Sequence, residues 1–173
     1  RARSTVAELF CFAYVWTIGG SLDERHWAEF DDVVRESFAP FVRLPGGGDV
    51  RDYYVPLHGE PGFKHWNERV APFAYDAKAP FFSMVVPTVD TTRYSFLLEH
   101  FVQVEKPALL TGFSGVGKSV IVADATARLV GSGKWASLPI SFSAQTSSLR
   151  TQETIEGKLE KRKKVLTAPP GKR

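Results

Sequence analysis

Large apolar side chains crowd the first part of the chain. From Thr5 to Ile18 they occupy nearly every side of a helix, which is typical of a helix buried in a larger assembly. Gly19-Gly20 ends this segment, and Ser21 to Glu24 then has the form of a capping box. Apolar residues recur at helical spacing from Trp27 to Phe38. The pattern predicts a pair of helices within residues 1–43.

The helical pattern stops at the three consecutive glycines that follow Pro45. Prolines, aromatic residues and charges then mix without a clear period, so residues 44–80 are predicted to form an irregular connector. Phe81 to Val86 is a short apolar run that indicates a strand and is ended by Pro87. Asp90 is placed to cap a following helix, whose apolar residues are Tyr94, Leu97, Leu98 and Phe101.

Strands and helices alternate in the last part of the chain. The short apolar segments 108–110 and 138–144 have the composition and spacing of strands. A helix is expected over residues 118–130 after a glycine-bearing loop, and a polar helix over residues 148–165. This order predicts an α/β fold with a parallel sheet in residues 81–173.

Residues 112–119 match the pattern G-x-x-x-x-G-K-[ST], which binds the phosphates of a nucleoside triphosphate. Glycine takes a positive φ readily, so the backbone can turn its N–H groups toward phosphate oxygens at the start of a helix. Lys118 is expected to reach the β- and γ-phosphates, and the Ser119 hydroxyl to be a ligand of Mg²⁺. The predicted phosphate-binding residues are Gly112, Phe113, Ser114, Gly115, Val116, Gly117, Lys118, Ser119 and Val120.

Hydrolysis needs two further groups, an acidic residue at the end of a neighbouring strand to hold Mg²⁺ and a group that orients the attacking water. No predicted strand after Gly117 ends in Asp or Glu. We therefore assign no catalytic residue, and we expect the 173-residue chain to bind nucleotide weakly and to hydrolyse it hardly at all. Val86, Pro87 and Thr88 are candidates for apolar contacts to a purine base.

Composition and charge narrow the possible partners. The 22 Lys and Arg residues are nearly balanced by 19 Asp and Glu, so a net charge of +3 does not indicate nucleic acid. The basic run 158–164 contains Glu160 and is expected to be a solvated helix face. Cys11 is the single cysteine, which excludes an internal disulfide and argues against zinc. No apolar run reaches the roughly 18 residues of a membrane span, so no membrane partner is predicted.

Six blocks of residues in the second half follow one another in an order that is more specific than the phosphate loop alone. They are Val86–Tyr94, Pro107–Ser119, Ile140–Ser148, Thr151–Glu153, Lys158–Arg162 and Ala168–Arg173. Together these blocks resemble the third AAA+ module of a dynein heavy chain. The sequences of the loop and of Phe142–Ser147 resemble those of axonemal rather than cytoplasmic dyneins.

The resemblance implies a partial P-loop AAA+ domain over residues 81–173, the first half of such a module. Residues 1–43 would be the helical end of the preceding module's lid, and residues 44–80 the lead-in between the two. In this family the third module binds ATP or ADP with Mg²⁺ and mainly regulates the principal ATP site, which lies in the first module. The chain shows no acidic strand, sensor residues or arginine finger, so the fragment is expected to be inactive although its parent is an ATPase motor.

A dynein heavy chain moves along microtubules and drives the beating of cilia and flagella. The resemblance therefore implies the remaining AAA+ modules as partners and, through other parts of the parent, intermediate chains, light chains and microtubules. It implies a place in the ciliary or flagellar axoneme, with the cytoplasm as the alternative. Because the chain begins at Arg1 without an initiator Met and ends soon after a Pro-Pro-Gly turn, we expect a longer parent chain.

Two other interpretations follow from the same residues. In the first, the segment is a structural part of the ring, and its site is empty or permanently filled with ADP. In the second, the loop belongs to an unrelated kinase or GTPase, which would need an acceptor site or a guanine-specifying Asn-Lys-x-Asp motif, and the sequence shows neither. The structural alternative stays open.

Overall fold

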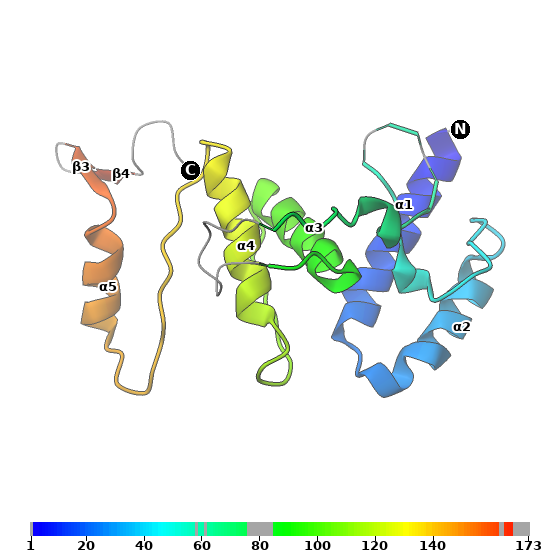
Figure 1. Ribbon diagram of the computed structural model, residues 1–173, viewed down its shortest axis with the longest axis horizontal. Helices are drawn as coiled ribbons and strands as arrows, with labels where there is room; N and C mark the ends of the chain where they lie inside the picture. The colour runs from blue at the N-terminus through cyan, green and yellow to red at the C-terminus, as the bar shows by residue number, and fades with distance from the viewer. Residues whose placement is uncertain (1, 58, 61, 76–84, 163–164, 168–173) are drawn as a thin grey trace. The chain divides into compact units, whose positions relative to one another are not determined.

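The computed structural model describes residues 2–57, 59–60, 62–75, 85–162 and 165–167 (Figure 1). The chain divides into two compact units. The first unit comprises residues 1–76 and 87–92, and the second comprises residues 77–86 and 93–173. In the described part of the chain, no helix is long and apolar enough to cross a membrane, and no three His, Cys, Asp or Glu side chains are grouped to hold a metal ion.

The predicted helical pair is confirmed in the first unit. Helix α1 spans Ala2–Ile18 and α2 spans Trp27–Phe38, with the short 3₁₀ turns η1 (Gly19–Ser21) and η2 (Glu24–His26) between them. The expected capping box is wrong, because Ser21 lies inside η1. Asp23 caps η2 instead, where its side chain accepts a hydrogen bond from the Arg25 backbone N–H at 3.1 Å.

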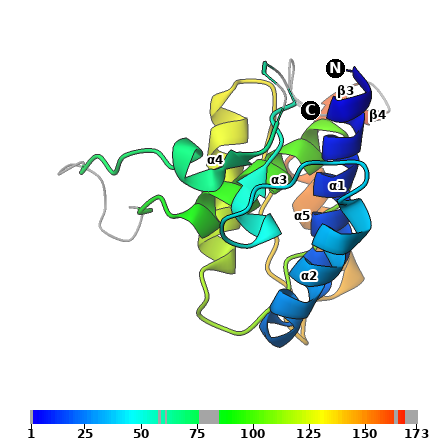
Figure 2. The same cartoon turned by 90° about the vertical axis from the view of Figure 1, so that its right-hand side faces the viewer.

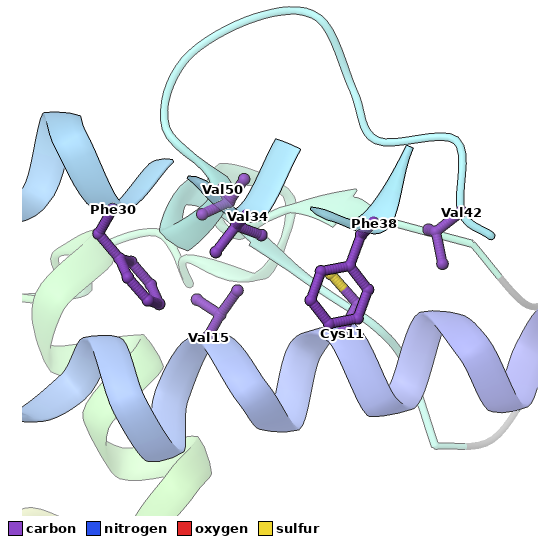
Figure 3. Close-up of a cluster of buried hydrophobic side chains, with 7 residues drawn as sticks. All are labelled: Cys11, Val15, Phe30, Val34, Phe38, Val42 and Val50. Carbon is purple, nitrogen blue, oxygen red and sulfur yellow. The ribbon is translucent and has the colours of Figure 1, made fainter. Parts of the chain in front are cut away.

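The core of the first unit lies where α1 and α2 face each other (Figure 3). Cys11 and Val15 are one turn apart on α1, and Phe30, Val34 and Phe38 follow the same spacing on α2, so each helix turns one apolar stripe inward. The remaining two buried members of this cluster are Val42 and Val50. Burial raises the pKa of the Cys11 thiol to about 11, because the thiolate would lose its hydration.

The connector is more ordered than its sequence pattern predicts. It contains the 3₁₀ turn η3 (Val50–Asp52), the antiparallel pair β1 (Tyr53–Tyr54) and β2 (Lys64–His65), and the 3₁₀ turn η4 (Trp66–Arg69). In β1–β2, Tyr53 lies opposite His65 and Tyr54 opposite Lys64. The Trp66 side chain is fully buried and stacks on Tyr54 with ring centroids 4.7 Å apart.

Hydrogen bonds between side chains and backbone hold the connector on the helical pair. Arg35 of α2 donates to the carbonyl oxygens of Pro45 and Gly48 at 2.6 and 2.9 Å. The Val50 N–H donates to Asp31 Oδ1 of α2 at 2.6 Å. Within the connector itself, Trp66 Nε1 donates to the Arg51 carbonyl at 2.9 Å. These bonds join residues that are ten or more positions apart in the sequence, so no local sequence pattern predicts them.

The second unit contains most of helix α3 (Val89–Gln103), together with α4 (Lys118–Gly131) and α5 (Ser148–Glu156). A short antiparallel pair follows, in which β3 (Glu160–Arg162) is joined to β4 (Val165–Thr167). Figures 1 and 2 both show α3 and α4 lying next to each other. The expected cap of α3 is wrong, because Asp90 lies within its first turn and the Thr88 hydroxyl accepts from the Thr91 N–H at 3.1 Å.

The predicted parallel sheet is not found among the described residues, whose two sheets are both antiparallel and two-stranded. Segments 108–110 and 138–144 form no ladder, and Leu109 and Phe142 are 87% and 71% exposed. A strand needs the hydrogen bonds of a neighbour, and neither segment pairs with another described segment, although Leu110, Leu138 and Ile140 are half-buried. Most of the run 81–86 lies outside the described residues.

The helix predicted over residues 148–165 is wrong beyond Glu156. The chain turns at Gly157, where the Lys158 N–H donates to the Ile155 carbonyl at 3.1 Å, and then enters β3. The described part of the basic run, residues 158–162, therefore does not lie on a helix. The polar surface of α5 offers little apolar area to bury, so nothing in the sequence extends it past the glycine.

Candidate nucleotide-binding loop

Three glycines give the loop its backbone conformation. Gly112, Gly115 and Gly117 have φ values of +141°, +82° and +89°, a region that other L-residues rarely adopt. A Cβ at Gly115 or Gly117 would meet no atom within 4 Å, so the requirement at these two positions is conformational rather than steric. The loop can therefore turn its N–H groups in one direction without strain.

Helix α4 begins directly at the end of this loop. Gly117 is its N-cap residue, and the Gly117 carbonyl accepts from the Ile121 N–H at 3.0 Å. No side chain caps this end of the helix. The N–H groups of the first turn have no acceptor within the helix, and the helix dipole places partial positive charge beside them. The arrangement suits an anion.

Lys118 folds back over the loop. Its Nζ donates to the carbonyl oxygens of Gly112 and Phe113 at 3.0 and 2.5 Å. The ammonium group thus joins the start of the loop to the first residue of α4. Its positive charge lies beside the same backbone turn whose amides are available to an anion, as a phosphate-binding lysine requires.

The remaining predicted loop residues are at the surface. Phe113 and Val116 are 85% and 60% exposed, and Ser114 and Ser119 are also exposed. Val120, 49% exposed, follows Ser119 in the first turn of α4. The structure therefore brings Gly112 through Val120 together as one continuous loop and helix start. The Ser119 hydroxyl is accessible to a metal ion carried by a nucleotide.

The predicted purine contacts lie in the segment before α3. Val86 is 56% exposed, and the Thr88 backbone N–H donates to the Thr91 hydroxyl at 2.8 Å, so Thr88 has a structural role in capping α3. Pro87 and Thr88 belong to the first unit, whereas the phosphate loop belongs to the second. A contact of these residues with a base stays a prediction.

An ion-pair cluster that the sequence pattern does not predict joins α3 to α4. Arg128 Nε donates to Glu99 Oε1 at 2.8 Å, and Arg128 Nη1 donates to Asp124 Oδ2. Partial burial lowers the pKa of Arg128, but the hydrogen bond to Glu99 and the two carboxylate charges outweigh burial and raise that pKa. The spacing of Asp124 and Arg128 is visible in the sequence, but the partner on α3 is not.

A glycine-rich phosphate-binding loop followed directly by a helix is the defining feature of P-loop proteins. The families that this chain matches show which class of P-loop protein it is. Residues 73–173 match a family described as the P-loop containing dynein motor region. Residues 1–68 match the dynein heavy chain AAA lid domain. The chain belongs to the dynein heavy-chain family.

Individual relatives agree with this assignment. The chain is 40% identical to dynein axonemal heavy chain 6 of Homo sapiens over 176 residues, covering 100% of this chain. It is 42% identical over 166 residues to the dynein-1-beta heavy chain of the flagellar inner arm I1 complex of Chlamydomonas reinhardtii, covering 94% of this chain. The chain spans about 4% of the length of each of these relatives. The resemblance to axonemal dyneins is confirmed.

Proposed function

We propose that this chain is a nucleotide-binding segment of an axonemal dynein heavy-chain motor and that residues 112–119 hold the phosphates of ATP or ADP. The observation that carries the proposal is the loop itself. Three positive-φ glycines expose backbone amides at the start of α4, and the Lys118 ammonium lies beside them. Membership of the dynein family supports a nucleotide as the anion.

Each loop residue has a defined role in this proposal. The backbone amides of the loop and of the first turn of α4 bind the phosphate oxygens, and Lys118 turns from its carbonyl partners toward the β- and γ-phosphates. Ser119 is the residue of the loop that would hold Mg²⁺, which neutralises phosphate charge when it is bound. Val86, Pro87 and Thr88 are assigned to the purine base.

We assign this site a regulatory rather than a catalytic role. The resemblance of residues 86–173 to the third AAA+ module supports this role, because that module mainly regulates the principal ATP site of the motor. Its nucleotide would gate the principal ATP site of the motor. The parent would work in the axoneme with its other AAA+ modules, with intermediate and light chains, and with microtubules. Residues 1–43 would belong to the preceding lid, 44–80 to the connector and 81–173 to the P-loop module.

Lys118→Ala tests nucleotide binding. Titration of the 173-residue chain with MgADP, followed by calorimetry, should show binding that the variant weakens at least about tenfold, because a charge-assisted contact to phosphate is lost. Lys134→Ala is the matched control, since Lys134 is an exposed lysine outside the loop. Equal affinity of wild type and Lys118→Ala would overturn the proposal.

The same variant separates regulation from a structural role. In the complete heavy chain, Lys118→Ala should change the velocity of microtubule gliding if the nucleotide at this site gates the motor. An unchanged velocity, together with lost nucleotide binding, would favour the alternative in which the segment is a structural part of the ring.

A further inference from the structure

Arg128 ties together the two helices on either side of the phosphate loop. Helix α3 ends at Gln103 and α4 begins at Lys118, so the loop lies in the connection between them. Glu99 is in the last turns of α3, and its carboxylate accepts from Arg128 at 2.8 Å. The two helices are therefore joined by an ion pair in the far half of α4 as well as by the chain that contains the loop.

The ion pair continues the inward face of α4. Ile121 and Ala125 are buried, and Arg128 follows them at helical spacing on the same face. Asp124, one turn before Arg128, accepts its second donor and so fixes the direction of the guanidinium. Elsewhere on α4, Val120, Val122 and Val130 are exposed, so the narrow inward face is what holds this helix.

Small rotations of α4 matter at its first turn. Ten residues separate Lys118 from Arg128, which is about 15 Å along a helix. A tilt of about 5° at Arg128 would displace the first-turn amides by about 1 Å, enough to impair a positioned contact. The direction of the phosphate-binding amides thus depends on how firmly the far half of α4 is held.

We propose that Arg128 is a positioning residue for the phosphate loop, which it acts on by clamping α4 to α3 through Glu99. The inference rests on the proposed nucleotide site and adds a residue that does not touch the nucleotide. Coupling between two sites is reciprocal, so nucleotide at the loop should in turn protect the backbone around Glu99 from opening.

Arg128→Gln in the full 173-residue chain tests the clamp in two ways. MgADP should bind about two- to fivefold more weakly, as expected for a half-exposed ion pair. Amide hydrogen exchange without nucleotide should become faster at residues 112–121, as well as around residues 99 and 128. Arg150→Gln, at an exposed position on α5, is the matched control and should change neither measurement.

A charge swap distinguishes positioning from general destabilisation. Glu99→Arg combined with Arg128→Glu should recover part of the affinity that either single change loses. Faster exchange only near residues 99 and 128, with unchanged exchange at 112–121 and unchanged affinity, would overturn the inference while leaving the proposed nucleotide site intact. Failure of the wild type to bind MgADP would instead overturn the proposed function, and with it the inference.

Discussion

Two regions of the molecule differ in what stabilises each of them. One is the helical pair with its connector, and the other is the phosphate-loop region. In the first, a continuous buried cluster joins α1, α2 and the connector. In the second, the buried hydrophobic side chains among the described residues are Phe96, Ile121 and Ala125, and the loop is shaped by glycine torsions and by the Lys118 hydrogen bonds. Stability is thus concentrated in one region, and binding geometry in the other. Substitutions should affect the two properties separately.

Trp66→Ala should have the largest effect. The side chain is fully buried and its ring packs against Tyr54 and Phe12, so its loss should lower the free energy of unfolding of the first unit by about 3–5 kcal/mol. Labelling of Cys11 with iodoacetamide at pH 8 measures this opening, since the native thiol is buried and its pKa is raised to about 11. Amide exchange at residues 112–118 should stay unchanged, and a parallel change there would show that the two regions are not separate.

Asp49→Ala should have the next largest effect. The Asp49 carboxylate caps η3 and binds the Arg51 guanidinium at 2.7 and 2.5 Å, so its loss should cost about 2 kcal/mol in urea unfolding at pH 7. Phe113→Ala, in the loop, serves as the control. A loss below about 0.5 kcal/mol would mean that the cap is dispensable.

Acid should weaken the same contact in the wild type. Burial raises the pKa of Asp49, but the hydrogen bonds and charge of Arg51 outweigh burial and hold that pKa below its usual 3.8. This stabilisation is complete above the unfolded value and is lost as the pH falls below about 4 through the folded value. As the pH falls from 5 to 2, the free energy of unfolding measured with urea should decrease less for Asp49→Asn than for the wild type.

Gly117→Ala should lower the free energy of unfolding less than Asp49→Ala does. Its φ of +89° is unfavourable for alanine, which should cost about 1 kcal/mol and weaken MgADP binding because the loop amides shift. Gly131→Ala, at the other end of α4, is the matched control because its Cβ would meet no atom within 4 Å and its φ is not positive. Calorimetry of both variants should show weaker binding for Gly117→Ala alone.

Phe113→Ala should have the smallest effect on stability. Its side chain is 85% exposed, so the change should alter the free energy of unfolding by less than about 0.5 kcal/mol. Urea unfolding followed by circular dichroism measures the difference. A loss of more than about 1 kcal/mol would show that this side chain is packed and that the loop region has a core of its own.

The parts of the fold that follow local rules are predictable from the sequence. The spacing of apolar residues predicts α1 and α2, and the glycines with Lys118 predict the loop and the start of α4. The connector is not predictable in this way, because its order depends on contacts such as Trp66 with the Arg51 carbonyl. Segments 108–110 and 138–144 have the composition of strands, but strand formation depends on a partner rather than on composition. The Arg128–Glu99 pair depends on how two helices pack, which spacing within one helix does not reveal.

The contact of Phe12 with Trp66 has a consequence for the time course of folding. Contacts between distant residues form slowly, because the intervening chain must first close a large loop, whereas turns and single helices form within microseconds. Lys118 and its carbonyl partners are at most six residues apart. We therefore expect the phosphate loop and α4 to form early during refolding. The first unit should reach its native packing only when Trp66 packs against Phe12 of α1.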